Sequence, residues 1–181
     1  MASSKKSKFI VLCVSLVVFI LILGAALSED THNSGSHAVR AFPVHKVDLL
    51  VGNERIQTKA LFQSEYQLVN VWASWCSICR AEHEFLNQLS EQGIAVIGLN
   101  YRDQAKAANQ YLAQLGDPYQ TVIYDPQGEL SIDLGVVGTP ETYLINQAGE
   151  IVYKHSGLLN LNIWQKQFCL LYTSPSPRDI S

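Results

Sequence analysis

Cysteine is scarce in this sequence, and its scarcity excludes two common uses of the residue. Of the four cysteines in 181 residues, only Cys76 and Cys79 lie close together. A single such pair is not the disulfide framework of a small secreted domain. A structural zinc site would need a second pair of Cys or His residues at a suitable spacing, and the sequence has none. Haem attachment would require histidine after the second cysteine, where Arg80 stands. We therefore expect neither a metal nor a small-molecule cofactor.

Positive charge is also scarce beyond the N-terminus. Three lysines, Lys5, Lys6 and Lys8, precede the first apolar run, and residues 28–181 then carry ten basic and sixteen acidic residues, a net charge of −6. This balance argues against nucleic acid or an anionic lipid surface as a binding partner.

One long apolar run lies near the N-terminus. Residues 9–27 carry no charge, and as a helix they would span roughly 28 Å, close to the hydrocarbon thickness of a bilayer. The lysines in residues 1–8 predict a cytoplasmic n-region, which places the rest of the chain outside. The alternative is a cleaved signal peptide, because residues 24–26 are small, although the run is longer than a usual signal core. Under both interpretations the rest of the chain is exported from the cytoplasm.

Composition divides the exported part into three segments. Residues 28–40 are largely polar without periodicity, which indicates a tether. Residues 41–168 carry the alternating apolar patterns of a folded domain. Residues 169–181 change composition abruptly and contain prolines that prevent a helix from continuing. We hypothesise that this tail is non-native, a remnant of sequence assembly or cloning.

Strands and helices are predicted to alternate in the folded domain. The apolar run at 68–72 predicts a central strand, and the spacing at 77–92 predicts a helix that ends at Gly93. A second strand at 94–99 completes a βαβ unit, which should be parallel and right-handed. Before this unit we expect an extended segment or hairpin at 41–53. After it we expect a helix from a cap at Asp103 to Leu115, strands at 121–124, 142–146 and 150–155, and a last helix capped by Asn160 or Asn162.

The two cysteines stand where the first of these strands turns into a helix. Cys-x-x-Cys at such a place is typical of a thioredoxin-like redox motif. One helical turn brings the sulfurs of Cys76 and Cys79 within reach of each other. The N-terminus of the helix directs unpaired amides at the first sulfur and favours its thiolate. Such a pair can attack another protein's disulfide and then release itself by closing its own.

Longer motifs around the pair resemble one family. Residues 69–83 (Val-Asn-Val-Trp-Ala-Ser-Trp-Cys-Ser-Ile-Cys-Arg-Ala-Glu-His) resemble the membrane-tethered, periplasmic thioredoxin-like proteins of cytochrome c maturation, the DsbE/CcmG type. Residues 135–142 (Gly-Val-Val-Gly-Thr-Pro-Glu-Thr) and 99–103 match further motifs, and the likeness covers about residues 42–168. It implies an α/β, thioredoxin-like fold in which helices flank a central mixed sheet, with an N-terminal transmembrane helix.

The resemblance also implies roles for single residues. Cys76 would be the nucleophile and the more exposed sulfur, and Cys79 the resolving thiol, with a mixed disulfide formed at Cys76. Pro140 resembles the family's cis-proline, which packs against the disulfide and exposes the backbone of Thr139 to an extended peptide; the alternative is an ordinary loop proline. Ser77 replaces the proline that the family usually has between the cysteines, so the family's reduction potentials do not transfer to this chain.

Acidic groups near the cysteines are expected to make the pair a reductant. Asn70 stands where typical cytoplasmic thioredoxins carry a buried aspartate, and it cannot titrate. The resemblance suggests Glu82 and Glu141 instead, with Glu82 three residues after Cys79 on the same helix face. A nearby carboxylate raises the pKa of a thiol and disfavours its thiolate. The alternative for both glutamates is a solvated surface charge.

Three neighbouring side chains complete the predicted site. We expect Trp75 to flank the sulfur as an apolar contact for partner chains and Trp72 to lie in the core. His83 is interpreted as a helix-surface residue rather than a proton shuttle.

The resemblance implies a protein-disulfide reductase of the inner membrane with its catalytic domain in the periplasm. Its client would be the Cys-x-x-Cys-His haem site of apocytochrome c or a partner thiol protein, and its electrons would come from a membrane thiol-disulfide reductant. Two alternatives stay open: a general periplasmic reductase with another client, such as a copper-site assembly factor, and a non-catalytic module that holds apocytochrome or haem.

Overall fold

The computed structural model describes residues 14–19, 40–52 and 54–169. The chain divides into two units, Met1–Ala38 and Val39–Ser181. In the first unit the described residues, 14–19, are helical. Among the residues that the structure describes, none of the helices is both long and apolar enough to span a bilayer. The predicted anchor at 9–27, the tether at 28–40 and the tail at 169–181 lie almost wholly outside the described residues.

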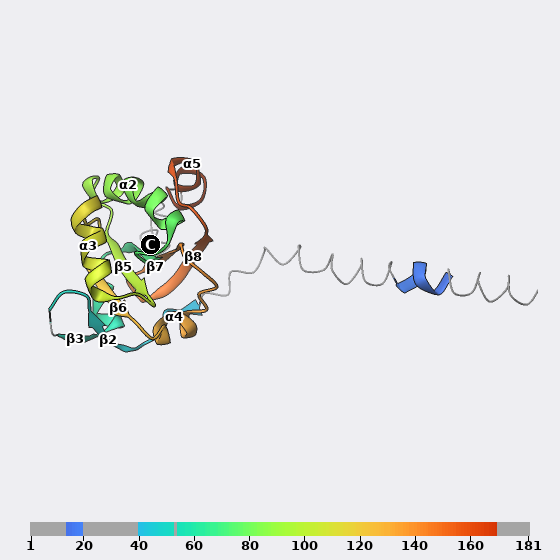
Figure 1. Ribbon diagram of the computed structural model, residues 1–181, viewed down its shortest axis with the longest axis horizontal. Helices are drawn as coiled ribbons and strands as arrows, with labels where there is room; N and C mark the ends of the chain where they lie inside the picture. The colour runs from blue at the N-terminus through green and yellow to red at the C-terminus, as the bar shows by residue number, and fades with distance from the viewer. Residues whose placement is uncertain (1–13, 20–39, 53, 170–181) are drawn as a thin grey trace, which may run out of the picture. The chain divides into compact units, whose positions relative to one another are not determined.

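The second unit contains a mixed sheet of eight strands in the order β1-β8-β7-β4-β5-β6-β2-β3 (Figure 1). The strands are β1 (Arg40–Ala41), β2 (Lys46–Leu49), β3 (Arg55–Gln57), β4 (Tyr66–Trp72), β5 (Val96–Tyr101), β6 (Thr121–Asp125), β7 (Glu141–Asn146) and β8 (Glu150–Ser156). The central strands β4, β5 and β6 run parallel, and β7 and β8 continue the sheet antiparallel beyond β4.

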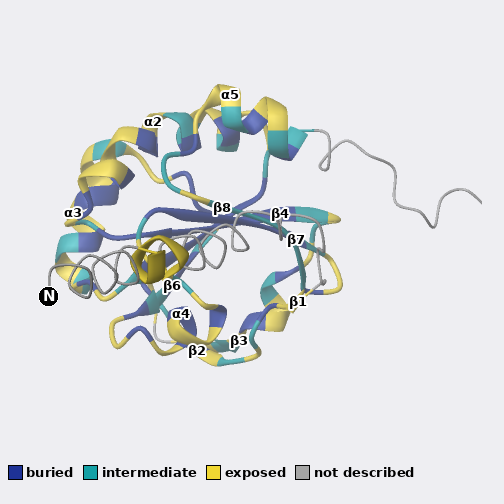
Figure 2. Ribbon diagram, turned by 90° about the vertical axis from the view of Figure 1, so that its right-hand side faces the viewer, coloured by how far each residue is buried: buried dark blue, intermediate teal, exposed yellow. Residues whose placement is uncertain are grey.

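Helices cover both faces of this sheet. They are α2 (Ser77–Glu91), α3 (Ala105–Leu115), α4 (Glu129–Leu134), α5 (Leu161–Ile163), the 3-10 helix η2 (Thr58–Leu61) and the π-helical segment η3 (Trp164–Phe168). Figure 2 shows α2, α3 and α5 on one face and α4 on the other. This arrangement confirms the predicted α/β fold, with β4, α2 and β5 as the parallel βαβ unit.

Strand β4 is central because both of its faces are buried. Its side chains alternate: Leu68 and Trp72 pack into the core under α2 and α3, whereas Val69 and Val71 pack into the core on the side of α4. A strand covered on both faces has a nearly continuous apolar sequence, which is why the apolar run at 68–72 predicted β4. The exception is Asn70, which is fully buried on the α2 side and therefore needs polar partners there.

Helix α2 forms where the apolar spacing predicts it and places its first residues at the end of β4. Leu86 and Leu89 are each 1% exposed and pack against the sheet, a burial worth about 1.5–3 kcal/mol for each side chain. The helix ends at Glu91, and Gly93 follows with a φ of 83°, which a residue with a side chain seldom adopts.

Two predictions of secondary structure need correction or completion. The short helix α4 is absent from the sequence prediction, because six residues are too few to show a helical period; Gly128 and Gly135, both left-handed, bound it. The segment at 41–53 is only half of a hairpin, since β2 pairs with β3 at Arg55–Gln57 and also with the edge of β6. Asn160 is confirmed as the cap of the last helix, where its side chain accepts a hydrogen bond from Ile163 N.

Candidate functional site

Cys76 and Cys79 form a disulfide at the junction of β4 and α2. Cys76 is the N-cap of α2, and its Sγ accepts a hydrogen bond from the backbone N–H of Cys79 at 3.0 Å. Cys76 is 6% exposed and Cys79 is 1% exposed, so the outer sulfur is the one expected to react first. In the reduced protein the same amide and the helix N-terminus would stabilise a thiolate at Cys76.

An apolar rim borders the disulfide. Trp75 is 59% exposed and Ile78 is 49% exposed, although both are large hydrophobic side chains. The indole of Trp75 is held by a hydrogen bond from Nε1 to the carbonyl of Arg102 at 3.1 Å. Trp72, by contrast, is 1% exposed, as predicted for a core residue. Exposed aromatic and aliphatic groups beside a reactive sulfur can bind an unfolded partner segment.

The peptide bond between Thr139 and Pro140 is cis, which confirms the prediction for this motif. Pro140 is buried, and its carbonyl accepts a hydrogen bond from Gly157 N at 2.9 Å. Val137, three residues before Pro140, is 91% exposed.

Asn70 is the centre of a buried hydrogen-bond network on the α2 face of β4. Its Oδ1 accepts from the hydroxyl of Tyr119 at 2.9 Å, and its Nδ2 donates to Glu82 Oε1 at 2.9 Å and to Thr142 Oγ1 at 3.1 Å. All four of these side chains are buried. The network uses an amide, which cannot titrate, to hold a carboxyl group, which can.

Glu82 is the titratable member of that network. It is 1% exposed, lies one turn after Cys79 on α2, and its Oε2 accepts from Leu159 N at 2.7 Å. Burial raises the pKa of Glu82 to about 7, against the opposing effect of the hydrogen bonds from Leu159 and Asn70. The alternative of a solvated surface charge is therefore wrong for Glu82. A carboxyl group that titrates near neutrality is suited to move a proton at an active site.

Glu141 is also buried, but its carboxylate lies on the other face of the sheet. Successive residues of a strand point to opposite faces, and it is the next residue, Thr142, that bonds Asn70. Glu141 instead accepts from the hydroxyl of Tyr143 at 2.6 Å and pairs with Lys154 at 3.0 Å. The alternative of a solvated surface charge is wrong here too, and the strand register directs this carboxylate away from the Asn70–Glu82 network. It ties the segment before Pro140 to β7 and β8, because it also accepts from Val137 N.

His83 is not a surface residue, contrary to the prediction. It is 2% exposed, and its Nε2 donates to the carbonyl of Gly116 at 2.8 Å. Its ring stands edge-on to Tyr111, with centroids 4.9 Å apart. Burial lowers the pKa of His83. The prediction failed because α2 packs against α3 as well as the sheet, which buries a wider stripe of the helix than the sheet alone would.

Comparisons with known proteins agree with this geometry. A family model described as Redoxin matches residues 37–162. The thiol:disulfide interchange protein DsbE of Vibrio cholerae is 38% identical over 171 residues, covering 90% of this chain and 93% of that protein. DsbE of Escherichia coli K12 is 40% identical over 167 residues, covering 87% and 90%. This chain belongs to the DsbE family. It is a thiol-disulfide oxidoreductase with a Redoxin domain.

Solved structures support the same family and fold. The crystal structure of a putative DsbE from Chlorobium tepidum superposes with a TM-score of 0.60 at 26% identity, covering 68% of this chain and 88% of that one. A secreted thiol-disulfide isomerase from Corynebacterium glutamicum superposes with a TM-score of 0.62 at 22% identity, which shows the shared fold.

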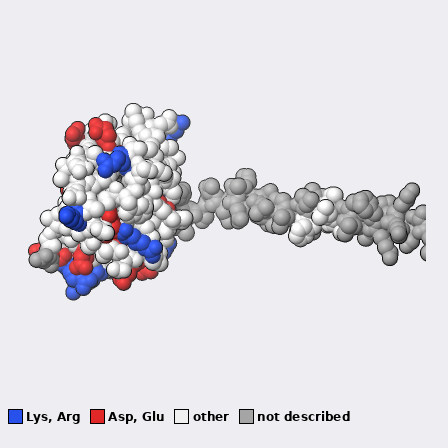
Figure 3. All heavy atoms as spheres, viewed as in Figure 1, with Lys and Arg blue, Asp and Glu red and all other residues white. Residues whose placement is uncertain are grey.

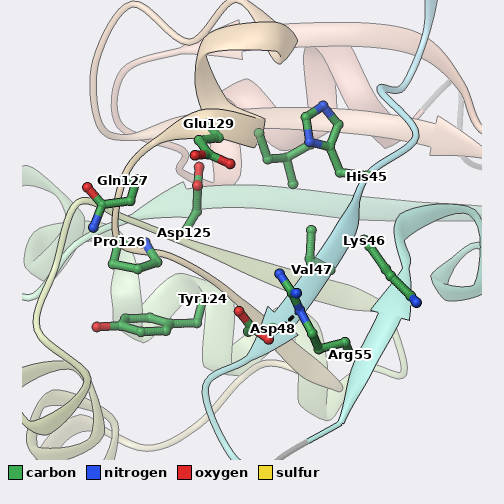
Figure 4. A pocket seen from close by; sticks show the side chains of 11 residues that line it. His45, Lys46, Val47, Asp48, Arg55, Tyr124, Asp125, Pro126, Gln127 and Glu129 are labelled. Atoms are coloured by element: carbon green, nitrogen blue, oxygen red, sulfur yellow. Dashed lines mark ion pairs between the residues drawn. The ribbon is translucent and has the colours of Figure 1, made fainter.

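A surface cavity lies apart from the cysteine pair of this DsbE-family chain. It measures about 230 Å³, between the β2–β3 hairpin and the start of α4 (Figure 4). Asp48 and Arg55 pair on its wall at 2.8 Å. No cysteine and none of the predicted site residues lines it. On the face drawn in Figure 3, acidic side chains gather over α2 with a basic side chain next to them, and charges of both signs lie around β2 and β3.

Asp103 is a site residue that the sequence prediction missed. It was expected to cap α3, but the N-cap is Gln104, and the carboxylate of Asp103 bonds Ser74, two residues before Cys76. The sequence offered one signal: the family motif at 99–103 ends on this aspartate.

Proposed function

We propose that this chain is a periplasmic reductase that opens disulfides in the haem-binding sites of apocytochrome c, or in a partner thiol protein, during cytochrome c biogenesis. The observation that carries the proposal is the pairing of Cys76 and Cys79 with the buried carboxyl group of Glu82 one turn further along α2. The membership in the DsbE family and the motif resemblance at residues 69–83 and 135–142 support the choice of client.

The reaction transfers two electrons and two protons to the client. The Cys76 thiolate attacks one sulfur of the client disulfide, whose S–S bond breaks, and the departing client thiolate takes up a proton. Cys79 then loses its proton, and its thiolate attacks Sγ of Cys76 in the mixed disulfide. The second client thiolate leaves and is protonated. The products are a client dithiol and the Cys76–Cys79 disulfide.

Glu82 is the proposed acceptor for the proton of Cys79. Its pKa of about 7 matches a group that must take up and return a proton near neutral pH. Once ionised, the carboxylate disfavours a thiolate at Cys79. Strong disulfide oxidants owe their potential to a stabilised reduced form, so a dithiol that lacks this stabilisation gives up electrons readily.

Client binding is assigned to the surface next to Cys76. Trp75 and Ile78 offer apolar contacts, and the backbone of Thr139, before the cis Pro140, is the proposed pairing site for an extended client segment. Glu141 has a supporting role, because its bonds fix the segment that leads into Pro140.

The location of the reaction follows from the proposed domain organisation. Residues 1–8 would lie in the cytoplasm, residues 9–27 would anchor the chain in the inner membrane, and residues 28–40 would tether the catalytic domain on the periplasmic side. A membrane thiol-disulfide reductant would reduce the Cys76–Cys79 disulfide after each turnover. Residues 169–181 have no role in this scheme.

Reduction of a defined peptide tests the proposal. The purified, fully reduced full-length chain is mixed with an oxidised apocytochrome c peptide that contains Cys-x-x-Cys-His, and free peptide thiols are counted. We expect one peptide disulfide opened for each chain, and no opening by Cys76→Ser. A control peptide keeps the disulfide but has alanine in place of the histidine and its neighbours. Equal rates for both peptides would favour the general reductase, and no reaction with either would contradict the proposal.

A further inference from the structure

Two loops that are far apart in the sequence meet beside the redox pair. The redox loop, residues 73–76, joins β4 to α2, and the support loop, residues 102–104, joins β5 to α3. The carboxylate of Asp103 accepts from Ser74 N at 2.5 Å through Oδ2 and from Ser74 Oγ at 2.8 Å through Oδ1. The indole N–H of Trp75 donates to the carbonyl of Arg102. The two residues directly before Cys76 are thus both held by the support loop.

The carboxylate of Asp103 is itself fixed in place. It is 8% exposed, and it also accepts from Asn100 Nδ2 at 3.0 Å and from Gln104 N at 2.8 Å. Four donors therefore converge on its two oxygens, which only an ionised carboxylate can satisfy together. The hydroxyl of Tyr124 donates to the backbone carbonyl of Asp103 at 3.2 Å. A group held so firmly transmits its position to whatever it binds.

The neighbouring residue supports the same contact. Arg102 has a φ of 45°, in the left-handed region that residues with a side chain seldom adopt. Its N–H donates to the carbonyl of Asp125 at 3.0 Å, and its own carbonyl accepts from Trp75. Unfavourable backbone conformations persist where the surroundings hold them, and they are frequent next to reacting groups.

We propose that Asp103 is a positioning residue for the redox reaction, which acts by fixing Ser74 and thereby holding Cys76 at the N-terminus of α2. The short bond from Cys79 N to Cys76 Sγ requires Cys76 to stay in the N-cap position. If the redox loop drifts, the sulfur leaves the amides that favour its thiolate. The proposal rests on the exchange activity of the family and not on the identity of the client.

A positioning role and a purely electrostatic role of Asp103 predict opposite shifts in the pKa of the Cys76 thiol for the variant Asp103→Asn. Loss of a negative charge near Cys76 would lower the pKa of its thiol, whereas loss of its position would raise it. Asparagine offers one acceptor oxygen, and its amide nitrogen would face at least one N–H donor wherever it points, so the set of four hydrogen bonds that fixes residue 103 against Ser74 cannot stay intact. The other charged groups around the redox loop, Glu82, Arg80 and Arg102, are the same in both proteins.

The chain offers a matched control in Asp125. This aspartate is 7% exposed, and its Oδ2 accepts from Ser131 N at 2.9 Å and from Ser131 Oγ at 2.7 Å, the same pair of donors that Ser74 presents to Asp103. It holds α4 and not the redox loop. Its backbone carbonyl, which accepts from Arg102, is unaffected by Asp125→Asn.

The test is the rate at which iodoacetamide alkylates Cys76 in the reduced full-length chain, measured across pH. The midpoint of this pH profile reports the ionisation of the Cys76 thiol. For Asp103→Asn we expect the midpoint to move upward by about one pH unit, with an alkylation rate about tenfold lower below the midpoint. Ser74→Ala, which keeps the charge and removes one bond, should move it in the same direction by less. Asp125→Asn should leave the midpoint unchanged even where its melting temperature falls as much.

Each of the following results would overturn the proposal. A downward shift for Asp103→Asn would show that its charge acts and not its position. An unchanged midpoint, or the same shift in Asp125→Asn, would show that the clamp has no specific effect on Cys76. If Asp103→Asn does not fold, Ser74→Ala decides alone, and an unchanged midpoint there would refute the proposal.

Discussion

Replacing Glu82 with glutamine should remove a pH dependence from the stability of the folded domain. In the unfolded chain this carboxyl group titrates near 4.5, and burial raises its pKa to about 7 in the folded protein. The folded state therefore binds the proton more tightly, and its stabilising effect is complete below pH 4.5 and is lost as the pH rises to 7. A shift of this size corresponds to about 3 kcal/mol in the free energy of unfolding.

Urea unfolding of the oxidised full-length chain at pH 4.5, 6 and 8 measures this effect. The free energy of unfolding of the unsubstituted protein should fall by about 3 kcal/mol between pH 4.5 and 8, beyond the change contributed by other groups. Glu82→Gln should lack that component. Its amide leaves one of the donors from Asn70 and Leu159 unpaired, a cost of about 1–3 kcal/mol that does not depend on pH.

The control for this experiment is Glu91→Gln. Glu91 lies on the same helix and is exposed, so its replacement should leave the pH dependence of the unsubstituted protein in place. If Glu82→Gln and Glu91→Gln show the same pH profile, Glu82 does not titrate near 7, and the proposed proton transfer from Cys79 loses its physical basis.

Three further outcomes are expected. Trp75→Ala should raise the KM for a disulfide peptide more than it lowers kcat, because the side chain is 59% exposed and is the proposed apolar contact for the client; a large loss of melting temperature would contradict this. Leu86→Ala should cost about 2–5 kcal/mol in urea unfolding, since its side chain is 1% exposed, whereas Leu161→Ala at 57% exposure should cost little. His83 should stay neutral in the folded protein at pH values where a histidine of the unfolded chain is protonated, because burial lowers its pKa. Its NMR titration should therefore lie below pH 6.5, and stability should fall as the pH drops below 6.5; a midpoint at or above 6.5 would refute the burial argument.

Local patterns were enough to predict the elements that carry the redox pair. The apolar run of β4 and the spacing of Leu86 and Leu89 in α2 each reflect burial against one sheet, which a short stretch of sequence records. The cis bond before Pro140 was predicted from the family motif alone, because nothing in the local chemistry of an X-Pro bond distinguishes cis from trans.

The errors have a common physical origin in contacts between distant segments. His83 is buried by the end of α3, and Glu141 turns away from Asn70 because of its strand register. Asp103 satisfies the pattern of a helix cap, yet the redox loop supplies a better set of donors from residue 74. Each of these side chains is polar and buried, so its partner, and with it its role, depends on tertiary packing that single-sequence periodicity does not encode.

Trapping of the mixed disulfide tests the exchange mechanism most directly. The full-length Cys79→Ser variant is reduced, mixed with an oxidised Cys-x-x-Cys-His peptide, quenched in acid and mapped by mass spectrometry. The account predicts a covalent adduct in which the peptide is bonded to Cys76. An adduct at another cysteine would contradict it. So would reduction of the peptide disulfide without any detectable adduct.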